Sequence, residues 1–335
     1  MPLLYVKNLS AGFDSKLGYI PAVTGVSFGV ERGRCVALVG ESGCGKSVTA
    51  MSLLKLLDMS CAHIEADELT FNGRDILRLP ANSMRQVRGN EISMIFQEPM
   101  TSFNPLMTVG AQVAESAALH LGYSRKAAKD AAIEMLHKVG IPEPEARYRN
   151  YPHQMSGGMR QRAMIAMAMV CGPKLLIADE PVTALDVTIS AQILELMNSM
   201  RRDSNMAVLM ITHSLGVVAE TAEEMLAMYA GQIVEQGDTR AVFERPLHPY
   251  MLGLMNAIPS VDTEKGKGLY AIKGTVPSPM FFSKACRFAE RCPYARELCR
   301  KQAPEYRLAE PEHYARCHFP PDEWVLSEQA NPGCA

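Results

Sequence analysis

The strongest constraint on the fold of this chain is the segment 40–47, which follows the pattern G-x-x-x-x-G-K-S. An apolar run at 36–39 predicts a buried strand before this segment, and residues 47–54 predict the first turns of a helix after it. In that context the glycines let backbone N–H groups approach phosphates, and the helix N-terminus adds partial positive charge. Lys46 is expected to reach the outer phosphates and Ser47 to bind Mg²⁺. The sequence therefore predicts a nucleoside-triphosphate site rather than an ordinary glycine turn. Its expected residues are Gly40, Glu41, Ser42, Gly43, Cys44, Gly45, Lys46 and Ser47.

The size and composition of the chain indicate a globular protein of two domains. Its 335 residues exceed one domain of about 150 residues, and its 47% hydrophobic content suits a packed core. The formal net charge of -2 offers no basic surface for nucleic acid, so we expect no nucleic-acid partner. No apolar run of about 18 residues predicts a membrane-spanning helix, and residues 1–7 lack the features of a secretory signal. We therefore expect a cytoplasmic location.

Two further apolar runs end in polar residues that suit phosphate chemistry. Residues 175–178 predict a parallel strand that ends at Asp179 and Glu180. Ligands bind at the carboxyl ends of such strands, so Asp179 can face Mg²⁺ and Glu180 can activate a water. Without the phosphate loop, two solvated acids at a strand end would be the simpler explanation. A third run, 207–212, ends at His213, which suits a catalytic and a structural role equally well.

Residues 155–162 predict a second helix terminus that can bind an anion. Ser156 can cap a helix that runs to about Cys171. The paired glycines Gly157 and Gly158 leave the first backbone N–H groups of this helix open to a phosphate. The chain therefore has two candidate phosphate-binding helix termini.

Taken together, these motifs resemble the ATPase subunit of an ATP-binding cassette (ABC) transporter. The resemblance covers the whole chain and implies an α/β fold of the P-loop NTPase class. That fold has a RecA-like core, an antiparallel β subdomain and a helical subdomain, expected here at about 98–160. The motifs, in order, are the loop at 40–47, Gln97, the segment 155–162, Asp179 with Glu180, Asp186 and His213.

The resemblance also implies a role for each motif. Phe13 would stack on adenine, and Gln97 would contact Mg²⁺ and the attacking water. Ser47 and Asp179 would hold Mg²⁺ as well. Glu180 would be the catalytic base, and His213 would contact the γ-phosphate. The other implied site residues are Ser156, Gly157, Gly158 and Gln161 of the signature, which would close on ATP bound by a second subunit, and Asp186 of the D-loop.

The resemblance divides the chain at residue 245. Residues 1–245 would form the nucleotide-binding domain. Residues 246–335 resemble the C-terminal extension of the oligopeptide, dipeptide and nickel import branch of this family. A polar linker is expected within the extension, at 262–268.

Four of the nine cysteines cluster in that extension: Cys286, Cys292, Cys299 and Cys317. Disulfides are disfavoured in a reducing compartment. Zinc sites usually show C-x₂₋₄-C pairs, whereas the gaps here are five, six and seventeen residues. Four thiolates suit a [4Fe-4S] centre, and some members of the resembled branch carry one on this extension. We favour the iron-sulfur centre, with zinc and free reduced cysteines as alternatives; Cys334 is not counted as a ligand.

The expected function is hydrolysis of ATP to power the import of di- or oligopeptides. The partners implied by the resemblance are a second ATPase subunit, favoured as a paralogue, two membrane permease subunits and an extracytoplasmic solute-binding protein. The expected location is the cytoplasmic face of a bacterial inner membrane. The same machinery could import nickel chelates or glutathione-like solutes. Alternatives of another class are a soluble ABC ATPase and a regulatory subunit that binds ATP without turnover.

Overall fold

The computed structural model describes residues 2–16, 18–97, 102–183, 185–258 and 271–326. The start of the expected helical subdomain at 98–101, the expected linker at 262–268 and Cys334 lie outside these residues. The chain forms two compact units. The first comprises the N-terminus to Leu4, Val30–Cys35 and Thr70–Ile211, and the second comprises Tyr5–Gly29, Val36–Leu69 and the residues from Thr212 onward.

Parallel strands form the sheet of the first unit. Their order is β7 (Ile92–Ile95), β8 (Leu175–Asp179) and β9 (Ala207–Thr212). Ile92 lies opposite Leu175, and Asp179 lies opposite Ile211. Every residue of β8 and β9 is buried, which explains why both sequences are continuous apolar runs. The predicted strands at 175–178 and 207–212 are confirmed.

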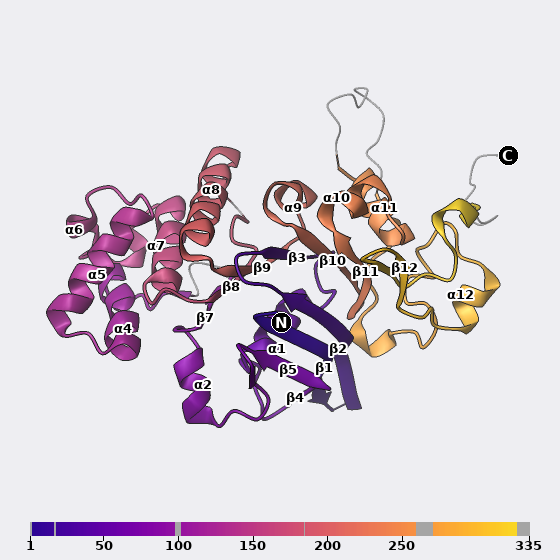
Figure 1. Cartoon of the computed structure of the whole chain (residues 1–335), viewed down its shortest axis with the longest axis horizontal. Helices are drawn as coiled ribbons and strands as arrows, with labels where there is room; N and C mark the ends of the chain where they lie inside the picture. The colour runs from indigo at the N-terminus through magenta and orange to yellow at the C-terminus, as the bar shows by residue number, and fades with distance from the viewer. Residues whose placement is uncertain (1, 17, 98–101, 184, 259–270, 327–335) are drawn as a thin grey trace. The chain divides into compact units, whose positions relative to one another are not determined.

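Helices make up much of the rest of the first unit. α4 (Val109–Leu121) packs on α5 (Arg125–Lys138), and both pack on α7 (Gly157–Met169), as the magenta part of Figure 1 shows. Ser124 caps α5 by accepting the backbone N–H of Ala127, and Gly140 follows the helix with a φ of 73°. This left-handed glycine ends the helix. The remaining elements of this unit are α2 (Ala81–Val87), α6 (Pro144–Arg147), the 3-10 turn η1 (Pro152–Gln154), α8 (Val187–Ser204) and β6 (Arg74–Asp75), which pairs with the end of β5 (Glu68–Phe71).

The second unit contains a mixed sheet and an antiparallel sheet. In the mixed sheet β3 (Cys35–Val39) is parallel to β10 (Glu224–Tyr229), which is antiparallel to β11 (Gln232–Asp238). The antiparallel sheet includes β1 (Leu4–Ser15), which pairs with β2 (Gly18–Val30) and β4 (Ala62–Glu65). β3 is buried along its whole length and leads into α1 (Lys46–Leu53), as the sequence predicted. The helices α9 (Leu215–Thr221) and α10 (Thr239–Glu244) belong to the same unit.

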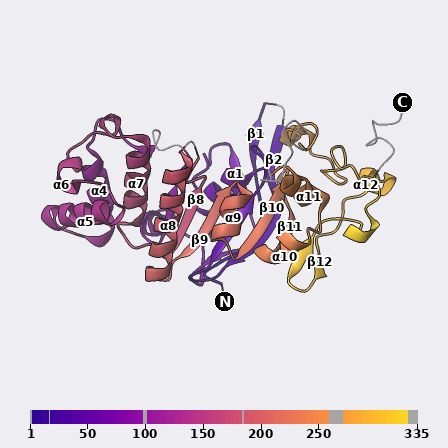
Figure 2. The same ribbon diagram turned by 90° about the horizontal axis from the view of Figure 1, so that it is seen from above.

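The C-terminal extension continues the mixed sheet of the second unit. β13 (His313–Ala315) pairs with β11, with Ala315 opposite Glu235, and β12 (Arg307–Glu310) pairs with β13. Figure 2 shows α11 (Pro249–Asn256) and the yellow extension beside β10 and β11. The other extension elements are the 3-10 turns η2 (Pro279–Phe281) and η3 (Pro321–Glu323) and the helix α12 (Glu297–Lys301). The boundary expected at residue 245 stays a prediction.

Within the part of the chain that the structure describes, no helix combines the length and apolar character needed to cross a bilayer.

Candidate nucleotide-binding and catalytic site

The phosphate loop between β3 and α1 requires glycine at two of its predicted positions. Gly40 has a φ of 155°, and a Cβ there would lie 2.2 Å from the carbonyl oxygen of Met228. Gly45, at a φ of 110°, would place a Cβ 2.9 Å from the carbonyl oxygen of Ala22. A side chain at either position would collide with backbone, so the loop can take this close path only with glycine.

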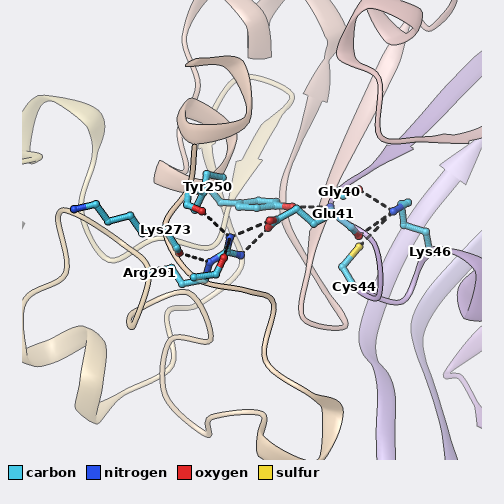
Figure 3. Close-up of polar contacts among 9 residues, drawn as sticks. Gly40, Glu41, Cys44, Lys46, Tyr250, Lys273 and Arg291 are labelled. Atoms are coloured by element: carbon cyan, nitrogen blue, oxygen red, sulfur yellow. Dashed lines mark hydrogen bonds and ion pairs between the residues drawn. The ribbon is translucent and has the colours of Figure 1, made fainter. Parts of the chain in front are cut away.

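Lys46 lies folded against the loop that it follows. Its side chain is 6% exposed, and Nζ donates to the carbonyl oxygens of Gly40 at 2.8 Å and Glu41 at 3.0 Å (Figure 3). These carbonyls hold the ammonium at the loop, where an incoming phosphate can exchange for them. Cys44 is buried beside it, and burial raises the pKa of its thiol. Ser47, in the first turn of α1, is half-buried.

The loop has supports that sequence reasoning missed. The backbone N–H of Glu41 donates to the Tyr250 hydroxyl at 2.9 Å, and the carboxylate of Glu41 accepts two hydrogen bonds from Arg291. Both partners belong to the C-terminal extension, 209 and 250 residues away along the chain. No local pattern links such distant positions. The sequence did offer one signal: the acidic side chain of Glu41 lies within a phosphate-binding loop and needs a cationic partner there.

In the first unit, Glu180 follows β8 and is held by two side chains. Gln97 Nε2 donates to Glu180 Oε2 at 3.2 Å, and the hydroxyl of Thr183 donates to the same oxygen at 2.8 Å. The structure therefore brings together Gln97 and Glu180, which the sequence placed in one site. Thr183 was not foreseen. The neighbouring Asp179 is 4% exposed at the end of β8.

The predicted second helix terminus is confirmed as the start of α7. Ser156 caps the helix by accepting the backbone N–H of Met159 at 3.3 Å. A Cβ at Gly157 would meet no heavy atom within 4 Å among the described residues, so the backbone there is open to a ligand. Gln161 is buried and donates its amide to the carbonyl of Pro181. Its described hydrogen bond therefore joins α7 to the segment after Glu180.

The remaining predicted site residues lie at element ends. Asp186 caps α8 by accepting the backbone N–H of Ile189 at 2.8 Å. His213 is exposed directly after β9. Phe13 is half-buried near the end of β1, opposite Ala62 of β4.

The four clustered cysteines line one small cavity of the second unit, together with aromatic side chains that include Phe288 and Trp324. Burial raises the pKa of Cys286 to about 11 and that of Cys292 to about 12. These shifts favour the protonated form of Cys286 and Cys292. Among the described residues, no group of three or more His, Cys, Asp or Glu side chains is placed to hold a metal ion.

Comparison with known proteins finds two matching families. Residues 23–183 match the family described as "ABC transporter", and residues 234–299 match "Oligopeptide/dipeptide transporter, C-terminal region". The chain is 50% identical over 329 residues to the probable peptide ABC transporter ATP-binding protein y4tR of Sinorhizobium fredii, covering 98% of this chain and 96% of that protein. It is 45% identical over 323 residues to the dipeptide transport ATP-binding protein DppD of Escherichia coli, covering 96% and 98%. Among solved structures, the ATP-binding cassette MJ0796 bound to ADP and Pi has a TM-score of 0.61 at 23% identity, covering 71% of this chain and 99% of that one.

A buried strand, a glycine-dependent phosphate loop and a helix, set in a mixed α/β sheet, define a P-loop nucleotide-binding protein. The fold class predicted from the sequence is thereby confirmed. The chain belongs to the ATP-binding proteins of the ABC transporter family, in the oligopeptide and dipeptide transporter branch.

Proposed function

We propose that this chain hydrolyses ATP to drive the import of di- or oligopeptides through a bacterial inner-membrane permease. The proposal rests on Lys46, which is buried against a loop whose backbone path requires glycine at positions 40 and 45. Relatives that are 45% and 50% identical along nearly the whole chain are named as dipeptide and peptide transport proteins, which supports the peptide class. Those names do not favour a soluble ATPase unrelated to transport.

Nucleotide binding would begin at the phosphate loop. Lys46 would exchange its carbonyl partners for the outer phosphates, and the N–H groups at the start of α1 would face them. Phe13 would stack on the adenine. The hydroxyl of Ser47, the amide oxygen of Gln97 and the carboxylate of Asp179 are oxygen donors of the kind that Mg²⁺ prefers, and they would hold this ion, which shields the phosphate charge.

Hydrolysis would use Glu180 as the base. Its carboxylate would take a proton from the water that attacks the γ-phosphorus, and the bond to the β-phosphate oxygen would break to give ADP and phosphate. Gln97 and Thr183 hold the carboxylate in place, so little reorganisation is needed at that moment. His213 would contact the γ-phosphate.

A complete site would need a second subunit. The open N-terminus of α7, with Ser156, Gly157 and Gly158, would close on ATP held by the phosphate loop of the facing ATPase. We propose a paralogue as that ATPase, with two permease subunits and a solute-binding protein outside the membrane. Residues 1–245 would form the nucleotide-binding domain, and residues 246–335 the extension of this branch.

Replacing the phosphate-binding lysine tests the proposal. Lys46→Ala should weaken ATP binding by at least about tenfold, because it removes a charge-assisted contact worth roughly 1.5–3 kcal/mol. The affinity is measured by calorimetry on the full chain. Cells that carry the variant in the assembled transporter should fail to take up labelled di- and oligopeptides. If wild-type cells took up nickel chelates and no peptides, the proposed peptide substrate would be wrong. Lys138→Ala, on the exposed face of α5, is the matched control.

We also propose that Cys286, Cys292, Cys299 and Cys317 hold a [4Fe-4S] centre. Four thiols line one cavity, which is the donor type that such a centre uses, and two imidazole side chains, His248 and His318, also line it. The role would be structural or regulatory, because a bound centre would staple a segment too small to be stable alone.

Metal analysis tests the iron-sulfur proposal. Protein purified without oxygen should be brown, with about four irons and four sulfides per chain. Replacing any one of the four cysteines by Ser should abolish the colour and open the segment to protease, while ATP is still bound. Cys171→Ser, outside the cavity lining, is the control and should leave the colour unchanged. Stoichiometric zinc without iron would overturn the proposal in favour of a zinc site.

A further inference from the structure

The segment from Cys286 to Cys292 forms a compact turn whose two ends line the cysteine cavity. The backbone N–H of Ala289 donates to the carbonyl oxygen of Cys286 at 3.2 Å. The backbone N–H groups of Arg291 and Cys292 both donate to the carbonyl oxygen of Phe288 at 3.0 Å. These bonds fix the directions of the side chains between the two cysteines. We call this segment the Cys286–Cys292 turn.

Arg291 ties this turn to the first variable position of the phosphate loop. Its two terminal nitrogens donate to the two carboxylate oxygens of Glu41, at 2.7 Å and 2.9 Å (Figure 3). The side chain of Arg291 is only 6% exposed, against 31% for Glu41. Its remaining donor capacity goes to backbone carbonyls, including that of Lys273 at 2.9 Å. A bidentate pair with this degree of burial fixes both position and angle.

Arg287 reaches the other side of the phosphate loop through one intermediate. Its guanidinium donates to the carbonyl of Ala230 at 2.5 Å and to the hydroxyl of Thr24 at 3.2 Å. The next residue, Gly231, donates its backbone N–H to the carbonyl of Cys44 at 2.8 Å. Cys44 lies within the loop, two residues before Lys46. Arg287 therefore stabilises the connection between β10 and β11, which in turn donates a hydrogen bond to the backbone of the phosphate loop.

Phe288 supplies a third, apolar link. It is 2% exposed and packs against two tyrosines, with ring centroids 5.1 Å from Tyr229 and 5.4 Å from Tyr250. The hydroxyl of Tyr250 accepts the backbone N–H of Glu41, the same residue whose carboxylate Arg291 binds. Glu41 is thus held at its backbone and at its side chain, and its carbonyl accepts from Lys46.

We propose that Arg291 is a positioning residue for ATP binding, through which the Cys286–Cys292 turn sets the shape of the phosphate loop. The inference rests on the proposed function, because it takes the loop as the ATP site. If the Cys286–Cys292 turn loses its ordered structure, the affinity for ATP should fall, but ATP should still bind.

Charge alone would act differently from positioning. If Arg291 acted only as a positive charge, Arg291→Gln would weaken ATP binding, while Glu41→Gln would strengthen it by removing a negative charge near the phosphates. If the pair positions the loop, both substitutions release the same contact. Both should then weaken binding, and the double variant should bind no more weakly than either single one.

The experiment measures ATP affinity by calorimetry on the full chain purified without oxygen. Arg291→Gln, Glu41→Gln and the double variant should each weaken binding by about tenfold, the equivalent of one charge-assisted contact. Arg240→Gln is the control, because its side chain is exposed and its described side-chain partner is Glu244 of the same helix, α10. Its affinity should match the wild type.

The outcomes separate this inference from the proposed function. Wild-type affinity in all of these variants, with Lys46→Ala defective, would overturn the role of Arg291 and leave the ATP site standing. Tighter binding by Glu41→Gln would also overturn it, in favour of a simple charge effect. If Arg291→Gln does not fold, Arg291→Lys retains the charge but cannot form the bidentate pair, and it should show the same loss of affinity at an unchanged unfolding temperature.

Discussion

Glu180 has a backbone conformation that is unusual for its residue type. Its φ of 49° lies in the left-handed region, where a non-glycine residue costs about 1–3 kcal/mol. The surroundings that hold it there are a backbone hydrogen bond from its N–H to Ile211 at 2.8 Å and the contacts of its carboxylate with Gln97 and Thr183. The left-handed conformation takes Glu180 out of the regular path of β8, which fits the base role that we propose for it.

Glu180→Gln tests this role directly. The variant keeps the shape of the side chain and loses the basic oxygen, so ATP binding should persist while hydrolysis in the assembled transporter falls at least about a hundredfold. Phosphate release and ATP binding are measured on the same preparation. Glu195→Gln, an exposed position on α8, is the control. Turnover within threefold of the wild type would refute Glu180 as the base.

A single buried carboxylate joins three elements of the second unit. Glu235 of β11 is 0% exposed and accepts the backbone N–H groups of Leu247 and His248, at 2.7 Å and 2.8 Å, just before α11. Its Oε1 also lies 2.9 Å from Nε2 of His313 on β13. Burial raises the pKa of this carboxyl, although His313 and the backbone N–H groups act against the shift. Glu235 therefore joins β11 to the segment before α11 and to β13 through polar contacts.

Removing that side chain should loosen the extension. Glu235→Ala would leave two buried N–H groups and His313 without their acceptor, so we expect the free energy of unfolding to fall by about 3–5 kcal/mol. Denaturant unfolding provides the measurement. The exposed Glu244→Ala, which breaks only an i,i+4 pair with Arg240, should change stability by less than about 0.5 kcal/mol. Equal stability of the two variants would show that Glu235 does not anchor the extension.

The chain contains two candidate phosphate-binding elements of the proposed ATP site, one in each unit. Its phosphate loop holds Lys46 among loop carbonyls, and its α7 presents an open N-terminus at Gly157. In the proposed assembly, each element would meet its complement on a second ATPase subunit. Assembly would then be part of catalysis, because water would be excluded from the phosphates only when the two subunits close.

The purified chain alone should therefore hydrolyse ATP poorly. Ser156→Arg should abolish turnover at the partner's site, because the added bulk and charge would block closure, while the variant's own ATP binding stays intact. Light scattering combined with an activity assay checks both statements. Ser204→Arg, at the exposed end of α8, serves as the control. Full activity in a sample that scatters as a monomer would refute the need for a second subunit.

Local patterns were enough to predict the phosphate loop, the strands β8 and β9, and the capped start of α7. In each of these segments the structure depends on nearby residues. Glycines permit one backbone path, a strand buried on both faces must be apolar, and a serine caps the helix that follows it. Gln97 and Glu180 could be placed in one site because the whole order of motifs resembles one family.

Contacts between distant segments lay beyond such patterns. Arg291 meets Glu41 across 250 residues, and Ala315 of β13 pairs with Glu235 of β11 across 80 residues, because folding brings together residues whose spacing in sequence carries no period. The φ of Glu180 likewise follows from its neighbours in space, since its own residue type disfavours that conformation. Local sequence was thus enough to predict the candidate phosphate-binding segments. The contacts that hold the phosphate loop, from Tyr250 and Arg291, could be seen only in the tertiary structure.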